Sequence, residues 1–519
     1  MHDSHLPPDL FAATLTLLEE LTAISSASGD AAGLERMAAR LAAELAARGL
    51  MAEVRRGLGD AGGNPIAAPA GGGSLPVVLA RGPVTAPAAT AATADAAATA
   101  DAAAPPAPEV PPDAGRLLLI GHFDTVLPAA APRRLGDRLV ATGAIDMKGG
   151  LATLCGALDL LARRGEAPPA GLLVVAVPDE EVGGELSRAA VARWGATARA
   201  LWVLEPGEPG SEAGSESLVG GRRGLFDWRL EARGKAAHSG LHLAAGRSAL
   251  LAAARWCLAA VEGAGALHDA AAGAPRAARG GGPAGGRTSV NVGRLVAGDA
   301  TFVTDLGAAH AWLGTERQLN VVPDRAIVEG EARFATAAAG EEVERRLAAL
   351  AAAVGAATGT ELVFTRGPLI PPVDARGPQR IWCDRAVALA AARGWRLEVE
   401  PERGGISFPN FLVEPGRIPV LDGLGPVGGG MHTRDEHVEL ASLARRIVLL
   451  ADLLAEEGAG GRSSTLIAAP FAMVRPGSTP VPRRTAPGPG TPRSRATPPR
   501  PVRSTTTAPP AGGTPDRRP

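Results

Sequence analysis

Short apolar runs alternate with amphipathic stretches over much of this chain. The runs with the length of buried strands are residues 116–121, 171–177 and 201–205. Residues 148–164 have the periodicity of a helix, residues 10–49 predict two more helices, and a short strand is expected at 51–56. Because buried strands separated by helices are typical of parallel sheets, we predict an α/β fold with a mostly parallel sheet flanked by helices.

The pattern changes near residue 218, where apolar and polar residues begin to alternate as in a half-exposed strand. Strands are expected at 225–232, 289–296, 326–334 and 361–364, and helices at 247–261 and 341–357. This order predicts a smaller α+β domain with an open-faced sheet. Short apolar runs return after residue 371, with helices expected at 381–393 and 440–457 and a strand at 418–421, so the smaller domain is inserted into the larger one.

We therefore predict a discontinuous domain built from residues 1–217 and 371–458, an inserted domain at 218–370, and a tail at 459–519. The tail is rich in Pro and Arg and is expected to be disordered. Residues 84–114 consist mainly of Ala, Thr, Asp and Pro, and they predict a disordered insertion. Residues 264–287 are rich in Gly, Ala and Pro, and they predict a loop insertion.

The composition narrows the class of protein. A chain of 519 residues is too long to fold around one ordinary hydrophobic core. Its net charge of −1 is the sum of a basic tail and an acidic remainder. The acidic charge of the remainder argues against a nucleic-acid partner for the folded part. Three scattered cysteines form no disulfide framework and favour a reducing compartment. Since the sequence shows neither a secretory signal nor an apolar run of membrane-spanning length, we expect a cytoplasmic protein without a membrane partner.

Polar residues follow the buried strands at their carboxyl ends, where open α/β sheets bind ligands. They are His122 and Asp124 after the first strand, Glu180 and Glu181 after the second, and Glu205 after the third, with Asp146 and His432 in two glycine-rich segments. Each alone is more often a solvated turn or a surface pair. Together, imidazole and carboxylate groups suit zinc, or less often manganese or cobalt, and one carboxylate can bridge two cations.

Seven short segments carry a resemblance to a known family. They are Gly-His-Phe-Asp-Thr-Val at 121–126, Gly-Ala-Ile-Asp-Met-Lys-Gly-Gly at 143–150, Pro-Asp-Glu-Glu-Val-Gly-Gly at 178–184, Glu-Pro at 205–206, Gly-Lys-Ala-Ala-His-Ser-Gly at 234–240, Asn-Val-Val-Pro at 320–323 and Gly-Gly-Gly-Met-His-Thr at 428–433. With them the chain resembles the dizinc metallopeptidases and amidohydrolases that include glutamate carboxypeptidase, aminoacylase, acetylornithine deacetylase and succinyl-diaminopimelate desuccinylase. The resemblance covers roughly residues 10–457 without the insertions, and residues 400–405 and 421–430 look closest to the glutamate carboxypeptidase branch.

The resemblance implies two zinc ions, with cobalt or manganese as possible substitutes. The implied ligands of one ion are His122, Asp146 and Glu205, and those of the other are Asp146, Glu181 and His432, with Asp146 bridging. Asp124 would orient His122, and Glu180 would be the general base. The peptide bond between Asp146 and Met147 is expected to be cis. His238 would donate a hydrogen bond to the oxyanion, often from the partner subunit of a homodimer. The inserted domain would form the dimer contact and would also serve as a lid.

The resemblance also implies residues that bind the substrate. Arg333 and Asn291 match positions that grip the substrate in the relatives, although ordinary strand polarity is the alternative interpretation of both residues. Gly404 and Gly405 belong to a glycine pair that precedes Ser-Asp or Thr-Asp in many relatives. Here Phe408 stands where that Asp is common, so substrate contacts of this loop do not transfer directly.

The predicted activity is zinc-dependent hydrolysis of an amide bond next to a free carboxylate. Foremost we expect a carboxypeptidase of the glutamate carboxypeptidase type that acts on a small peptide. The alternative is a deacylase that removes an acyl group from an N-acyl amino acid. A third alternative, a binding protein without catalytic activity, is disfavoured because all five implied ligands and Glu180 are present.

Overall fold

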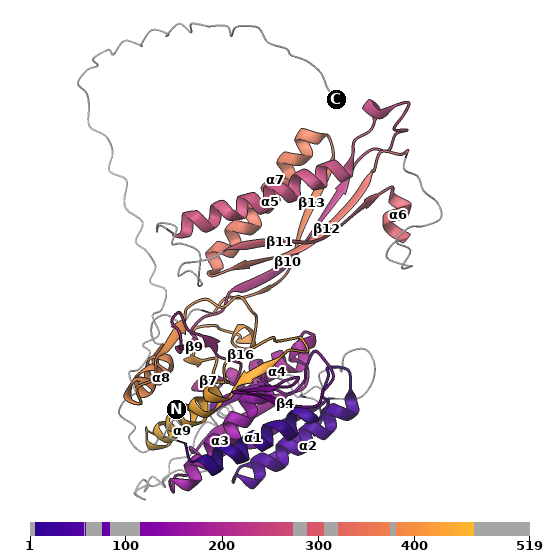
Figure 1. The fold of residues 1–519 in the computed structure, drawn as a ribbon. Helices are drawn as coiled ribbons and strands as arrows, with labels where there is room; N and C mark the ends of the chain where they lie inside the picture. Colours follow the sequence, from indigo (N-terminus) through magenta and orange to yellow (C-terminus); the bar gives the residue numbers. More distant parts are fainter. Residues whose placement is uncertain are drawn as a thin grey trace, which may run out of the picture. The chain divides into compact units, whose positions relative to one another are not determined.

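The computed structural model describes residues 6–56, 58, 75–83, 115–272, 288–305, 320–373 and 380–460 (Figure 1). All of them belong to one unit, Met1–Leu466, whereas the second unit, Ile467–Pro519, lies outside the described residues. The predicted insertion at 84–114 and the tail beyond residue 460 likewise lie outside the described residues.

A six-stranded sheet positions most of the predicted site. Its strands lie in the order β1 (Met51–Arg56), β2 (Pro76–Arg81), β6 (Leu172–Val177), β3 (Leu117–His122), β7 (Ala200–Val203) and β15 (Val420–Leu421). The four strands from β6 to β15 run parallel, whereas β1 and β2 pair antiparallel. Every residue of β3 and β6 is buried, as expected for parallel strands that are covered on both faces.

Helices pack against this sheet and against one another. They are α1 (Pro8–Ala23), α2 (Ala31–Ala47), α3 (Lys148–Arg163), α4 (Glu185–Gly195), α8 (Ile381–Ala392) and α9 (Leu440–Gly460). Helix α3 contacts both α1 and α9. Asp30 caps α2 by accepting the backbone N–H of Gly33 at 2.9 Å. Within the described ranges, no helix is both long enough and apolar enough to cross a lipid bilayer.

Two small sheets join segments that are distant in sequence. One has the order β16 (Gly428–Gly429), β17 (His437–Glu439), β5 (Arg138–Val140) and β4 (Arg133–Leu135), and the other has the order β14 (Leu397–Glu400), β9 (Glu216–Val219) and β8 (Glu208–Pro209). Pairing of β17 with β5 brings the chain around His432 to the chain that leads into Asp146. The sequence patterns did not predict these short strands.

The inserted α+β domain has a four-stranded antiparallel sheet. Its order is β11 (Ser289–Gly298), β12 (Arg325–Phe334), β10 (Gly224–Arg233) and β13 (Glu361–Ile370), and its helices are α5 (Ala249–Ala272), α6 (Ala300–Asp305) and α7 (Ala337–Thr358). Helices α5 and α7 pack on the sheet around Trp228 and Trp256, whose ring centroids lie 5.0 Å apart. The predicted α/β fold with an inserted α+β domain is confirmed.

Helix α5 is longer than the pattern predicted. The loop expected at 264–287 is wrong for residues 264–272, which continue the helix, and residues 273–287 lie outside the described residues. Alanine is the strongest helix former, so an alanine-rich segment that directly follows a packed helix extends it.

Candidate metal centre

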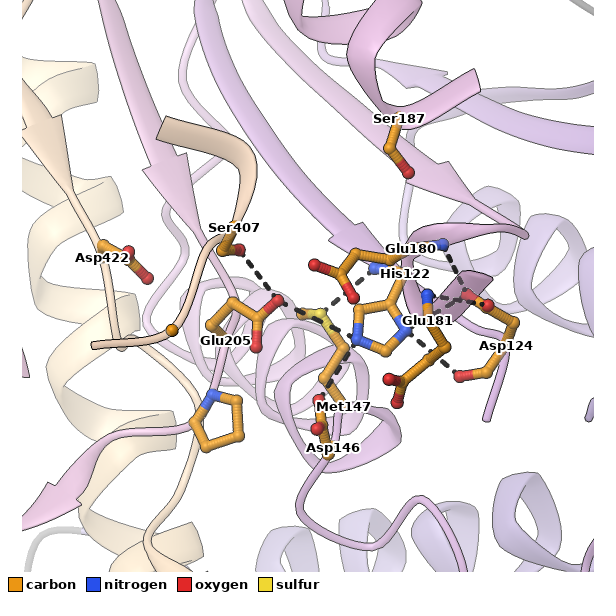
Figure 2. Close-up of polar contacts among 12 residues, drawn as sticks. His122, Asp124, Asp146, Met147, Glu180, Glu181, Ser187, Glu205, Ser407 and Asp422 are labelled. Carbon is orange, nitrogen blue, oxygen red and sulfur yellow. Dashed lines mark hydrogen bonds and ion pairs between the residues drawn. The ribbon is translucent and has the colours of Figure 1, made fainter. Parts of the chain in front are cut away.

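Three neighbouring strands deliver polar side chains to one edge of the main sheet. His122 is the last residue of β3, Glu180 and Glu181 stand in the 3₁₀ turn after β6, and Glu205 follows β7. Because these strands are adjacent and parallel, their carboxyl ends meet at the same edge. Figure 2 shows the carboxylates of Asp146, Glu181 and Glu205 around the His122 ring.

His122 is fully buried and has oxygen atoms on both sides of its ring. Its Nδ1 lies 3.1 Å from the backbone oxygen and 3.3 Å from the carboxylate of Asp124. Its Nε2 lies 3.2 Å from Oδ1 of Asp146 and 3.9 Å from Oε1 of Glu205. Burial opposes protonation, but the hydrogen bonds with Asp124 and Asp146 raise the pKa of His122 well above its usual value. With Nδ1–H directed at Asp124, Nε2 is the nitrogen that can bind a cation among the carboxylates.

Asp146 lies between two histidines. Its Oδ1 faces His122, and its Oδ2 lies 3.3 Å from Nε2 of His432. Burial opposes ionisation, but hydrogen bonds from both histidines hold the pKa of Asp146 well below its usual value. The peptide bond between Asp146 and Met147 is cis, as expected.

Glu181 completes the contacts on the His432 side. Its Oε2 lies 3.2 Å from Nε2 of His432. The hydrogen bond with Asp146 raises the pKa of His432 to about 9, against an opposing effect of burial. The residues form two groups, and within each group the potential ligand atoms all lie within 4.8 Å of one another. One group is His122, Glu180 and Glu205, and the other is His122, Asp146 and Glu181. The structure thus brings together all five predicted ligands and Glu180.

The charge of this cluster fits divalent cations. Burial, with the nearby charge of Glu205, raises the pKa of Glu180 to about 8, and burial together with the charge of Asp146 raises that of Glu181 to about 7. Burial and Asp146 also raise the pKa of Glu205. Carboxylates this close together oppose one another's ionisation, and a bound cation reverses that effect. Imidazole nitrogen and carboxylate oxygen are also the donor set of catalytic zinc sites.

Asp124 supports both neighbouring strand ends. One carboxylate oxygen accepts the backbone N–H of Glu180 and the other accepts that of Glu181, each at 3.2 Å. The hydroxyl of Ser28 donates to the same carboxylate at 2.8 Å. Asp124 is completely buried, so its contacts fix the turn that carries the two glutamates as well as the His122 ring.

A buried turn supports Glu205. The hydroxyl of Ser407 donates to Oε1 of Glu205 at 3.0 Å. The next residue, Phe408, is completely buried and its ring centroid lies 6.5 Å from that of His122. An apolar side chain therefore lies close to the His122 ring.

Ser28, Ser407 and Glu436 contact candidate ligands or their loops, and the sequence did not single them out. The three are ordinary polar residues whose partners are 96, 202 and 290 positions away. Of these three residues, only Ser407 lies in a recognised segment, the Gly-Gly-x-Ser sequence. That segment was noted through the resemblance and gave no indication that Ser407 contacts Glu205.

Arg333 and the Gly404–Gly405 pair contact each other. Arg333 on β12 forms an ion pair with Glu331 and donates from Nη1 to the backbone oxygen of Gly404. The backbone oxygen of Gly405 accepts from Nη1 of Arg222 at 3.1 Å. The Arg333 guanidinium is therefore already bonded to protein groups in this conformation.

Asn291 and His238 lie in the inserted domain. Asn291 on β11 faces Glu331 of β12 and lines a groove of about 560 Å³ on the sheet. His238 accepts the backbone N–H groups of Gly240 and Leu241 at its Nδ1, at 3.2 and 3.3 Å. Its Nε2 lies 3.5 Å from Nδ2 of Asn320. A histidine ring can donate a hydrogen bond from whichever nitrogen carries the proton.

Among known protein families, residues 118–456 match peptidase family M20/M25/M40. Carboxypeptidase G2 from Pseudomonas sp. (strain RS-16) is 26% identical over 354 residues, which cover 66% of this chain and 74% of the relative. The segment that matches the family contains the candidate metal centre.

Solved structures share the fold at low sequence identity. Aminopeptidase PepT from Bacillus cereus ATCC 10987 matches with a TM-score of 0.60 and 18% identity, covering 86% of this chain and 98% of that protein. A Bacillus subtilis protein described as a dinuclear metal-binding peptidase matches with a TM-score of 0.52 and 15% identity, covering 87% of this chain and 99% of that protein. At these identities the likeness concerns the fold alone.

Proposed function

Because the chain belongs to peptidase family M20/M25/M40, we propose that it is a metal-dependent carboxypeptidase that hydrolyses the amide bond next to a free carboxylate. The observation that carries the proposal is the placement of Asp146. Its two oxygens face two different histidines, and Glu180 lies in the same buried cluster. The carboxypeptidase activity named for the Pseudomonas relative supports the choice of reaction.

We propose that the cluster holds two zinc ions, for which cobalt or manganese can substitute. The first ion would be held by His122, Asp146 and Glu205, and the second by Asp146, Glu181 and His432. When bound, such ions polarise the substrate carbonyl and lower the pKa of a bound water to about 7. The Bacillus subtilis neighbour described as a dinuclear metal-binding peptidase supports the count of two.

Glu180 is the proposed general base. Its carboxylate lies within the cluster, while its backbone N–H is held by Asp124. Glu180 takes the proton of the attacking water and returns it to the leaving amine, a role that such residues perform when they lie within hydrogen-bond reach. His238 would donate a hydrogen bond to the oxyanion of the transition state, from the partner subunit of the proposed homodimer.

The proposed substrate is a small peptide with a free carboxylate. Arg333 can bind a carboxylate with two parallel N–H groups. It would exchange its bonds with Glu331 and Gly404 for bonds with the substrate. Asn291 and the Gly404–Gly405 backbone are the other proposed substrate contacts.

The test combines a metal measurement with a substrate panel. The purified chain is assayed for zinc content and for hydrolysis of dipeptides ending in glutamate and of N-acyl amino acids. We expect two zinc ions per chain, the number that a two-metal site requires, and faster hydrolysis of the dipeptides. Faster hydrolysis of the N-acyl amino acids would identify a deacylase instead. A chain that binds no metal and hydrolyses nothing would contradict the proposal.

Glu180→Ala isolates the base from the metal ligands. We expect kcat to fall by about 10²- to 10⁴-fold, the contribution of a general base, while zinc content stays at the wild-type level. Glu185→Ala is the matched control, because Glu185 lies on the surface at the start of α4. Unchanged turnover in Glu180→Ala would assign the base to another residue.

We also propose the inserted domain at 218–370 as the lid, a homodimer formed through it, and a cytoplasmic location. Helix α5 supports the dimer because it exposes large apolar side chains, namely Leu250, Leu251, Leu258 and Val261. Three unpaired cysteines support the location. Light scattering tests the dimer, and a monomeric mass at micromolar concentration would contradict it.

A further inference from the structure

Glu436 binds the chain segment that carries Asp146. The side chain is buried, with 4% of its surface exposed. Its Oε2 accepts the backbone N–H of Gly143 at 2.8 Å, and its Oε1 accepts those of Ile145 and Asp146 at 3.1 and 3.0 Å. Both carboxylate oxygens are therefore used to hold one short loop in place.

The same residue is joined to the loop that carries His432. Glu436 lies four positions after His432, between strands β16 and β17. Its backbone oxygen accepts the N–H of Ala141 at 3.0 Å. Strand β17, which follows Glu436, pairs with β5, which directly precedes Ala141. Glu436 thus attaches the His432 loop to the Asp146 loop through both its backbone and its side chain.

The burial of this carboxylate needs a reason. An ionised carboxylate is costly to bury, and Asp146 lies close enough to oppose its ionisation. The nearby Lys148 donates its Nζ to the backbone oxygen of Ile24 rather than to Glu436. Three backbone N–H groups are therefore the donors that satisfy Glu436, and they belong to the loop of the candidate bridging ligand.

We infer that Glu436 is a positioning residue that sets the separation of Asp146 and His432 and thereby the affinity of the second metal site. The inference rests on the proposed function only in requiring that the two sites hold cations. The first site has its own supports in Asp124 and Ser407, so a change at Glu436 affects the two sites unequally.

The experiment measures metal binding rather than activity alone. Metal-free wild type, Glu436→Gln and Glu436→Ala are titrated with zinc by calorimetry, and folding is checked by circular dichroism. We expect two binding events in the wild type. In Glu436→Gln the second event weakens by about 10- to 100-fold, the usual effect of losing a group that orients a ligand. The first event weakens less, because Asp124 and Ser407 also support that site. Saturating zinc restores kcat.

Glu439→Gln is the matched control, because Glu439 lies three residues further along and pairs with Arg138 at the surface. It should bind both ions as the wild type does. Two wild-type binding events that stay unchanged in both Glu436 variants would overturn this inference alone, and so would equal weakening of both events. A wild type that binds no cation would overturn the proposed function as well. If the Ala variant does not fold, the Gln variant, which keeps the shape of the side chain, decides.

Discussion

The two halves of the candidate metal centre are built in different ways. On one side, Glu205 is 8% exposed, follows a buried parallel strand and accepts a hydrogen bond from Ser407. On the other side, the His432 side chain is 54% exposed and its residue has a φ of 63°, a left-handed conformation that is uncommon for residues other than glycine. One half belongs to the sheet, and the other depends on a loop.

This difference predicts unequal metal binding. A ligand at the end of a packed strand is held in place before the cation arrives, whereas a loop ligand must be held by additional contacts. We therefore expect the first site to bind more tightly and the second to exchange its ion faster.

Asp146→Ala removes the carboxylate that both halves share. We expect both ions to be lost and turnover to disappear, because His122 and His432 no longer face a common ligand. Metal analysis after dialysis, together with an activity assay, measures the effect. One ion retained at wild-type affinity would show that the halves do not share Asp146.

Ser407→Ala weakens only the buried half. Removing the hydroxyl that holds Glu205 should lower the affinity of the first site by about 10- to 100-fold. Ser407→Thr keeps the hydroxyl and serves as the control in the same zinc titration. If Ser407→Ala weakened the second site more than the first, the proposed assignment of ligands would be wrong.

The smallest predicted effect is a pH dependence of the metal-free chain. The raised pKa values of about 7 for Glu181 and about 9 for His432 belong to groups that hold their protons more tightly when folded. Each contributes stability that is complete below its unfolded pKa and lost as pH rises through its folded pKa. The free energy of unfolding should therefore fall between about pH 5 and pH 9.

Bound metal counteracts the loss of stability at higher pH, because cations bind the deprotonated ligands. The increase in Tm caused by added zinc should be larger near pH 8 than near pH 6. Thermal unfolding with and without zinc at the two pH values checks this. An equal increase in Tm at both would mean that Glu181 and His432 do not titrate with the metal site.

The sequence predicted the buried half of the site better than the exposed half. Strands β3, β6 and β7 are apolar at nearly every position, so their ends could be located and the ligands after them could be read directly. Strands β16 and β17 contain two and three residues without an apolar run, and nothing in the pattern marks them. Placement of His432 therefore came from the resemblance.

Supporting residues were not predictable for a different reason. Ser407 and Glu436 are common polar residues, and their importance arises from partners brought together by the fold. Periodicity reports which face of an element is buried, but it carries no information on which distant group a buried hydroxyl or carboxylate meets. Helix α4 was missed as well, because five of its eleven residues are exposed or only partly buried and a glycine pair precedes it.

The contacts of Asp124 have a consequence for how this chain can evolve. One of its oxygens meets the Glu180 N–H and the His122 ring, and the other meets the Glu181 N–H and the Ser28 hydroxyl. An asparagine would place an amide NH₂ against donors, and a glutamate would need space that a fully buried site lacks. Position 124 should therefore tolerate no other residue while selection for hydrolysis lasts. Among descendants of this chain, a change there would mark the lineages that have abandoned catalysis.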